Sequence, residues 1–273
     1  MLVVINCMKS RTSPSSLRTA AFWAFVLVTG AVTAMGGNLF VSDASDSKVF
    51  QYRPDGMRHT FASVFNAEGL AFDAAGNLYV TDFNESIIYE FGLNGKMRIV
   101  ASGGPISDPS ALAFDTSGNL FVAHNGAGPG IAKIAPDRTI SSFVSHLEPT
   151  GLAFDAAGYL FATDYLSNTV LKYAPDGTGT TFATGFGQPA DLAFDSAGNL
   201  FVSDLVDGII YKIAPDGTKS TFATGLAQPL GLAFDRSGNL FVADYPNILE
   251  FTPDGTRSTF ASGIAPWDLA FSP

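Results

Sequence analysis

The sequence predicts an all-β protein: a six-bladed β-propeller of four-stranded blades, its ring closed by pairing of the N- and C-terminal strands in one blade. Three observations predict this fold. First, a unit recurs at a nearly constant spacing, with equivalent Phe residues at positions 72, 114, 154, 194, 234 and 271. Second, each unit contains four short strand-like runs separated by turns. Third, the two chain ends carry complementary parts of one unit.

Within each unit, the string Leu-Ala-Phe-Asp, or a close copy, predicts the innermost strand. It is short and apolar throughout, as is typical of a strand buried on both sides. A tight turn follows, in which Asp caps the turn and Gly supplies positive φ. The run Gly-Asn-Leu-Phe-Val, or a variant, then predicts the second strand.

A third strand, such as 209–211, leads to a Pro-Asp-Gly turn, and a fourth strand of the type Ser/Thr-Thr-Phe-Ala completes the unit. The N-terminal copy of the second-strand run, 37–40, has no innermost strand before it, whereas Leu269-Ala270-Phe271 has no second strand after it. Joined, these two runs make the sixth blade. The Phe residues recur at fixed blade positions and are expected to form the core between blades.

Residues 1–34 differ from the repeats. From Met8 to Arg18 the chain is basic and polar without an acidic residue, and from Thr19 to Ala34 it is apolar and ends in small residues. This pattern predicts a secretory signal peptide, with Met8 a more natural start than Met1. The alternative is an uncleaved anchor, but the apolar run is shorter than the roughly 20 residues that span a bilayer. We expect 35–273 to be the propeller, secreted or periplasmic, without membrane association after cleavage.

The overall charge limits the partners. The chain has 15 basic and 25 acidic residues, a net charge of −10. Because this charge repels phosphate, we exclude nucleic acid and anionic lipid as partners. Its one cysteine, Cys7, excludes an intramolecular disulfide framework and a Cys-rich zinc site. We expect a monomer whose partner is a small molecule, a carbohydrate or a protein.

One face of the predicted propeller collects two rings of residues. The first ring precedes the innermost strands and consists of Glu68, Ser110, Thr150, Ala190, Leu230 and Trp267, with Asp191 and Asp268 one residue further along. The second ring ends the second strands and consists of Asp43, Asp82, His124, Asp164, Asp204 and Asp244; Phe83, Tyr165 and Tyr245 follow it in three blades. The candidate binding mouth comprises Glu68, Asp82, Phe83, His124, Asp164, Tyr165, Asp191, Asp204, Asp244, Tyr245, Trp267 and Asp268.

The second ring has a structural interpretation. An Asp that recurs in five blades is part of the repeat, and we expect it to accept hydrogen bonds from the turn that follows. The third blade departs from this pattern with His124. Histidine is a candidate ligand or general base, and the alternative is a blade whose sequence has drifted and whose loop has loosened.

The run 228–244 (Gln-Pro-Leu-Gly-Leu-Ala-Phe-Asp-Arg-Ser-Gly-Asn-Leu-Phe-Val-Ala-Asp) resembles an NHL repeat, and all six units carry most of the pattern. NHL propellers are similar in sequence to the senescence marker protein/gluconolactonase family and to virginiamycin B lyase and strictosidine synthase-like propellers. The resemblance therefore implies the fold, while one fold hosts many activities.

The resemblance to gluconolactonases implies a divalent metal over the central channel, held by a Glu and by Asn and Asp residues before innermost strands. Glu68 matches the Glu position, but Ser110, Thr150, Ala190 and Leu230 stand where Asn or Asp is required. Glu68 is thus the sole, weak metal candidate, and no catalytic residue is assigned.

The sequence favours a secreted, non-catalytic propeller that binds a ligand or protein on its loop face and needs no cofactor. The alternative enzyme is a metal-dependent, gluconolactonase-like hydrolase or lyase with a degenerate site, which would use calcium or another divalent cation. A mainly structural extracellular module is a third alternative.

Overall fold

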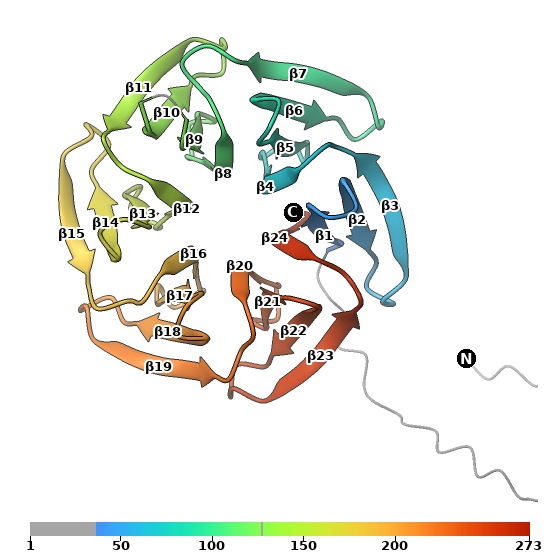
Figure 1. Cartoon of the computed structure of the whole chain (residues 1–273), viewed down its shortest axis with the longest axis vertical. Helices are drawn as coiled ribbons and strands as arrows, with labels where there is room; N and C mark the ends of the chain where they lie inside the picture. The colour runs from blue at the N-terminus through green and yellow to red at the C-terminus, as the bar shows by residue number, and fades with distance from the viewer. Residues whose placement is uncertain (1–36, 127) are drawn as a thin grey trace, which may run out of the picture. The chain divides into compact units, whose positions relative to one another are not determined.

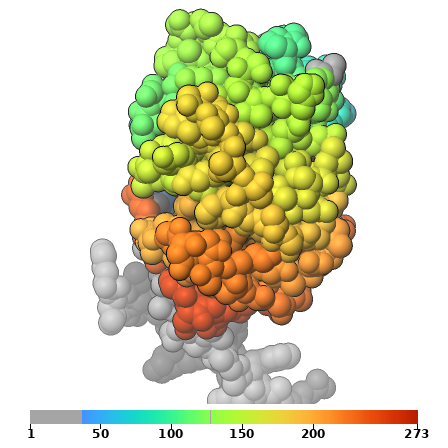
Figure 2. All heavy atoms as spheres, turned by 90° about the vertical axis from the view of Figure 1, so that its left-hand side faces the viewer, coloured from blue at the N-terminus to red at the C-terminus, as the bar shows by residue number. Residues whose placement is uncertain are grey.

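The computed structural model describes residues 37–126 and 128–273, so the predicted signal peptide, 1–34, lies outside the described residues. In the described part, 24 strands form six four-stranded antiparallel sheets arranged around a centre (Figure 1). The predicted fold, a six-bladed β-propeller, is confirmed. Figure 2 views the propeller from its edge, where the fourth blade (yellow) lies between the third (green) and the fifth (orange).

In each blade four strands follow one another from the centre of the ring outward. The first blade comprises β24 (Pro266–Phe271), β1 (Leu39–Asp43), β2 (Lys48–Tyr52) and β3 (Arg58–Ser63); the second comprises β4 (Ala67–Phe72), β5 (Leu78–Asp82), β6 (Ile87–Phe91) and β7 (Met97–Ser102); the third comprises β8 (Pro109–Phe114), β9 (Leu120–His124), β10 (Gly130–Ile134) and β11 (Ile140–Ser145). The fourth comprises β12 (Pro149–Phe154), β13 (Leu160–Asp164), β14 (Thr169–Tyr173) and β15 (Gly179–Ala183); the fifth comprises β16 (Pro189–Phe194), β17 (Leu200–Asp204), β18 (Ile209–Ile213) and β19 (Lys219–Thr224); the sixth comprises β20 (Pro229–Phe234), β21 (Leu240–Asp244), β22 (Asn247–Phe251) and β23 (Arg257–Ser262).

The ring closes in the first blade, as predicted. Strand β24, from the C-terminus, pairs antiparallel with β1, with Leu39 opposite Phe271 and Val41 opposite Leu269 (Figure 1). Beyond the strands, the Ser272 N–H donates to the Asn38 carbonyl at 2.9 Å. The two ends of the described chain are therefore held together by backbone hydrogen bonds.

The second strand of each blade is the most buried. Every residue of β1, β9, β13, β17 and β21 is buried. The Leu-Ala-Phe strands were expected to be buried on both sides, but residues of β16 and the Phe ends of the others are only partly buried. The innermost strands surround the centre of the ring and have a strand neighbour on one edge only, whereas the second strands have a strand on both edges.

The recurring aromatic residues form the core between blades, as predicted. The second-strand aromatic of each blade packs edge-to-face on the innermost-strand Phe of the next blade. The ring centroid of Phe201, for example, lies 5.0 Å from the ring centroid of Phe222 in its own blade and 5.0 Å from that of Phe234 in the sixth blade. One side chain thus joins two blades.

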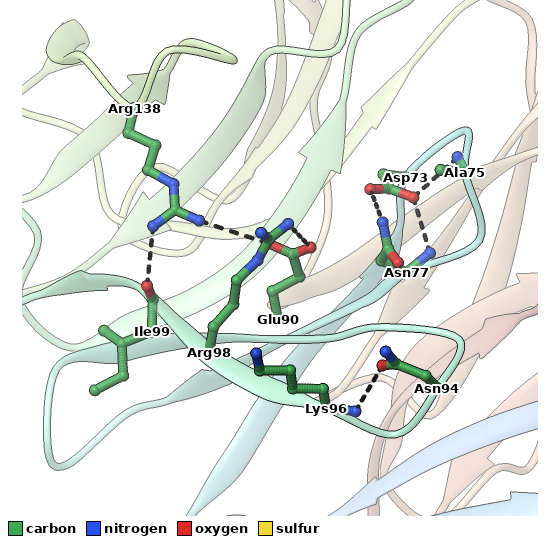
Figure 3. A network of polar contacts seen from close by, with 9 residues as sticks. All are labelled: Asp73, Ala75, Asn77, Glu90, Asn94, Lys96, Arg98, Ile99 and Arg138. Atoms are coloured by element: carbon green, nitrogen blue, oxygen red, sulfur yellow. Dashed lines mark hydrogen bonds and ion pairs between the residues drawn. The ribbon is translucent and has the colours of Figure 1, made fainter.

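The turn between the first and second strands of blades two to six follows the expected chemistry. In the second blade, Asp73 Oδ1 accepts hydrogen bonds from the Ala75 and Asn77 backbone N–H groups at 3.0 and 2.8 Å (Figure 3). Gly76 in the same turn adopts φ +84°. Equivalent contacts recur at Asp115, Asp155, Asp195 and Asp235. The repeated Asp and Gly are therefore needed by the turn.

A blade-specific ion pair lies beside this turn. Glu90 on β6 is 3% exposed, and its carboxylate accepts hydrogen bonds from the Arg98 guanidinium, with Arg138 of the third blade 4.0 Å away (Figure 3). In the fifth blade the equivalent side chain is Lys212, whose ammonium lies 5.2 Å from the Phe201 ring centroid. The second blade thus uses a carboxylate where the fifth uses a cation.

No helix long and apolar enough to cross a membrane occurs in residues 37–126 and 128–273.

Candidate functional site

A cavity of about 410 Å³ lies where the beginnings of the innermost strands meet the loops after the second strands. All six residues of the first ring line it, one from each innermost strand: Glu68, Ser110, Thr150, Ala190, Leu230 and Trp267. Further lining residues are Phe83, Ala111, Asn125, Tyr165, Gln188, Asp191, Leu205, Gly231 and Asp268. The structure therefore brings the whole first ring together around one cavity.

A local irregularity aims the first ring into the cavity. In every blade the pairing register shifts near the start of the innermost strand; in the second blade Ala67 pairs with Asp82 and Leu70 with Val80. The Glu68–Gly69 pair thus lies opposite Thr81 alone, whose hydroxyl accepts a hydrogen bond from the Gly69 N–H at 2.8 Å. Such bulges redirect side chains that would otherwise alternate across the strand.

Asp191 and Asp268 connect neighbouring blades. Asp191 Oδ2 accepts a hydrogen bond from the Leu232 N–H of the next blade at 2.8 Å. In the same way, Asp268 Oδ2 accepts from the Leu70 N–H at 2.7 Å. Both carboxyl groups are partly buried. Each therefore supports the ring as well as lining the cavity.

Glycine on the preceding blade makes room for each of these carboxyl groups. A Cβ atom at Gly151 would lie 2.6 Å from Asp191 Oδ1, and one at Gly231 would lie 2.9 Å from Asp268 Oδ1. These separations are shorter than van der Waals contact, so glycine at these positions is required by the neighbouring Asp.

The electrostatics of the cavity favour the neutral form of its acids. Burial raises the pKa of Glu68 to about 8, helped by the charges of Asp108 and Asp268 and opposed by a hydrogen bond from Asn66. Burial also raises the pKa of Asp268 to about 7, and burial and then the charge of Asp268 raise the pKa of Asp191. No Lys, Arg or His is among the described residues that line the cavity.

The second-ring aspartates accept hydrogen bonds from the backbone. In blades one, two, four and five the donor lies in the turn that follows, as expected, whereas Asp244 accepts only from the loop before β20. Asp82 Oδ1 accepts from the Glu85 N–H at 3.0 Å and Asp164 Oδ1 from the Leu166 N–H at 3.2 Å. Asp204 and Asp244 also bind the loops that enter their blades, accepting from the Gln188 N–H at 3.0 Å and the Gln228 N–H at 2.7 Å. Within the described chain, Asp82, Asp164, Asp204 and Asp244 do not line the cavity.

His124 lies behind the cavity wall. It is 6% exposed, its Nδ1 has no hydrogen-bond partner among the described residues, and burial lowers its pKa. It is not one of the lining residues. In the third blade the lining side chain is the next residue, Asn125, whose Nδ2 donates to the Ser110 hydroxyl at 3.1 Å.

The aromatic candidates separate into two groups. Phe83, Tyr165 and Trp267 line the cavity, with Tyr165 and Trp267 42% and 40% exposed. Tyr245 is 50% exposed and does not line it. The turn that carries Tyr245 spans only 245–246, whereas the turn that carries Tyr165 spans 165–168.

Sequence reasoning missed five lining residues: Ala111, Asn125, Gln188, Leu205 and Gly231. Asn125 and Leu205 occupy the same blade position as Phe83 and Tyr165, directly after the second ring, so the repeat alignment contained a signal for them. Gln188 lies in the loop before β16, where the repeat pattern does not predict whether a residue lines the cavity.

The residues present do not fit the metal of gluconolactonase-like propellers. The side chains of Ala190 and Leu230 have no atom that can coordinate a metal ion. The Ser110 and Thr150 hydroxyls donate hydrogen bonds to the Pro149 and Pro189 carbonyls at 3.3 and 3.1 Å. In the described part of the chain, no three His, Cys, Asp or Glu side chains are grouped to hold a metal ion. Glu68 alone supplies too few oxygens for a cation that takes six or more.

Together, the ring of blades and the cavity at its centre define the chain as a six-bladed β-propeller with a loop-face pocket. No protein-family model matches the sequence. No curated protein is significantly similar to it.

Solved structures share the fold. A propeller from a nidogen/laminin complex is 19% identical, with a TM-score of 0.79 over 87% of this chain and 99% of that one. A gluconolactonase of Xanthomonas campestris is 18% identical, with a TM-score of 0.71 over 78% of this chain and 81% of that one. The catalytically inactive virginiamycin B lyase of Staphylococcus aureus with quinupristin is 18% identical, with a TM-score of 0.62 over 71% and 69%. At these identities the likeness concerns the fold alone.

Proposed function

We propose that the protein is a non-catalytic binding module that takes its ligand in the central cavity on the loop face. The observation that carries this proposal is the chemistry of the cavity wall. Phe83, Tyr165, Leu205, Leu230 and Trp267 contribute apolar surface from five blades. A concave, mainly apolar pocket with a few polar groups is the usual form of a small-molecule site.

The polar side chains in the wall support binding over catalysis. Asp191 and Asp268 accept backbone hydrogen bonds from neighbouring blades, and the Ser110 and Thr150 hydroxyls donate to backbone carbonyls. A general base or nucleophile must be free to exchange a proton with substrate at hydrogen-bond distance. These four groups are occupied by the fold, and Glu68 is the one lining carboxyl group whose only hydrogen bond in the described chain is the long one from Asn66.

The surroundings of the cavity support a role in recognition. Leu166, Val206 and Tyr245 are 67%, 66% and 50% exposed, and they lie on the loops after the second strands. Exposed apolar side chains gathered near a pocket are typical of interaction sites. The nidogen/laminin complex is an example of a similar propeller from a protein–protein assembly.

The proposal includes a compartment. The N-terminal charge and hydropathy pattern supports export, so the mature chain should begin near Met35 in a secreted or periplasmic protein. N-terminal sequencing of exported protein tests this expectation. A mature chain that still contains Phe22 to Val28 would indicate an anchor instead.

The test against the enzyme alternative uses Glu68, the one metal-ligand position that the chain retains. We expect calorimetric titration of the full chain with calcium and with zinc to show binding no tighter than millimolar, and sugar lactones to be hydrolysed no faster than without protein. A Glu68→Gln variant should behave like the parent. Micromolar metal binding in the parent that disappears in the variant would favour the hydrolase.

A further inference from the structure

We propose that the central cavity selects an organic cation, namely an ammonium group carried on an apolar or aromatic body. This inference rests on the proposed function, because it assigns a ligand class to the same cavity. It follows from the charges that line the wall, from an unsatisfied carboxyl oxygen and from the aromatic rim.

The first observation is an uncompensated charge pattern. Glu68, Asp191 and Asp268 line the cavity, and no basic side chain of the described residues lines it with them. Elsewhere in the described chain, the buried Glu90 is paired with Arg98, whereas the fully buried Asp204 is held by backbone N–H groups. Glu68 is buried, Asp191 and Asp268 are partly buried, and no basic side chain among the described lining residues neutralises them, so a ligand can supply the cation.

The second observation concerns Glu68. This residue is 6% exposed, and its only side-chain hydrogen bond within the described chain is a long one, 3.4 Å from Asn66 Nδ2 to Oε1. Its other oxygen, Oε2, has no partner there, and the residue lines the cavity. Oε2 is therefore an acceptor open to the cavity, and an ammonium N–H would supply the donor that the described chain does not.

The third observation is the aromatic wall. Phe83, Tyr165 and Trp267 line the same cavity as the carboxyl groups. Aromatic faces attract cations through their quadrupole while also packing against apolar groups. A cation with an apolar body can bind the carboxyl groups and pack against the aromatic faces, whereas a hydrated metal ion has no apolar surface to pack against them.

Binding of a cation should be linked to proton release. Glu68 faces Asp108, Asp268 and the Asn66 amide, and Asp268 faces Asp191 and the N–H groups of Leu70 and Leu269; all the ionisable groups in this set are acids. Burial and mutual repulsion favour their protonated forms, and a bound cation favours the ionised form. Affinity for a cation should therefore increase between pH 6 and 8.5.

The experiment compares three probes of similar shape on the full chain: 3-phenylpropylammonium, the uncharged 3-phenylpropanol and the anionic 4-phenylbutanoate. Calorimetry at pH 8.5 should give affinities in that order, with the cation bound at least about tenfold more tightly than the alcohol. The preference should shrink at pH 6. In two buffers of different ionisation enthalpy, cation binding should release protons.

Two pairs of variants test which residues of the cavity produce the preference for the cationic probe. Glu68→Gln should lower cation affinity about tenfold and leave the alcohol unchanged, whereas Glu85→Gln, at an exposed position in the turn after β5, should change neither. Tyr165→Ala should weaken all three probes, whereas Tyr245→Ala, the same blade position outside the cavity, should not. Circular dichroism confirms that each variant is folded.

The outcomes separate the two proposals. Equal affinity for the cation and the alcohol, or tighter binding of the anion, would overturn the cation inference while retaining the binding pocket. Absence of binding for all three probes at millimolar concentration would contradict both proposals. If Glu68→Gln does not fold, the probe series on the parent and the tyrosine pair still decide the question.

Discussion

Two carboxyl groups in the cavity wall, those of Glu68 and Asp268, connect the stability of the fold to pH most clearly. Glu68 is held by the second blade in a nearly fully buried position with a single weak hydrogen bond. Asp268 comes from the first blade and binds the backbone of the second. The pKa of each carboxyl is raised, to about 8 and about 7, chiefly by burial. These two acids therefore make stability depend on pH.

The direction of this dependence follows from proton binding. The ordinary pKa of Glu68 is 4.5 and its folded value is about 8, so between these limits the folded chain holds a proton that the unfolded chain has lost. The stabilisation is complete below pH 4.5 and is lost as pH rises to about 8. We expect the melting temperature of the parent to fall between pH 5 and 8.5, and that of Glu68→Gln to fall less. Thermal unfolding followed by circular dichroism checks this, and parallel curves for the two proteins would contradict it.

At the scale of the elements, the second strand organises each blade. It is fully buried in five blades, because it is enclosed by strands on both edges and by blades on both faces. Its aromatic side chain contacts the fourth strand of its own blade and the innermost strand of the next. Stability should therefore be concentrated there and not in the exposed outer strands.

Truncation of one such aromatic tests this expectation. Phe201→Ala removes a side chain that is 3% exposed and leaves a cavity between the fifth and sixth blades. We expect the free energy of unfolding to fall by about 3–5 kcal/mol. Phe65→Ala, at a position 58% exposed, is the control and should change it by less than about 0.5 kcal/mol. Urea unfolding of both variants measures the difference; a similar loss in each would contradict the assignment.

At the scale of the whole molecule, closure of the ring depends on one strand from the far end of the chain. Strand β24 pairs with β1 and lines the central cavity through Trp267 and Asp268. Without it, β1 would lose its inner partner and the first blade its contact with the sixth, made by Phe271 on Phe241. An open ring exposes unpaired strand edges.

Deletion of residues 267–273 should therefore abolish cooperative unfolding of the entire propeller and not only loosen the first blade. Removal of Pro273 alone, an exposed residue beyond β24, should leave the melting temperature unchanged. Calorimetry of the two shortened chains is the measurement. A chain lacking 267–273 that melts at the parent temperature would show that β24 does not close the ring.

The sequence alone determined the number of blades, the order of strands and the closure. These properties depend on local chemistry, repeated at a constant spacing: Asp and Gly define the turn at Asp73, and a Phe such as Phe201 recurs where two blades meet. The incomplete unit at 37–40 and the spare strand ending at Phe271 identified the closing blade because each lacks the part that the other has.

Which side chains reach the centre was decided only by the tertiary structure. Tyr165 and Tyr245 occupy the same repeat position, yet only Tyr165 lines the cavity. Asp191 and Asp268 were predicted to belong to the binding mouth and they line the cavity, but only the structure shows that each also binds the backbone of the next blade. The raised pKa of Glu68 likewise arises first from burial and then from the charges of Asp108 and Asp268, which other blades bring close to it. The physical reason is that a repeat reports the local backbone, whereas the cavity depends on turn lengths and on contacts between blades that the ring alone brings together.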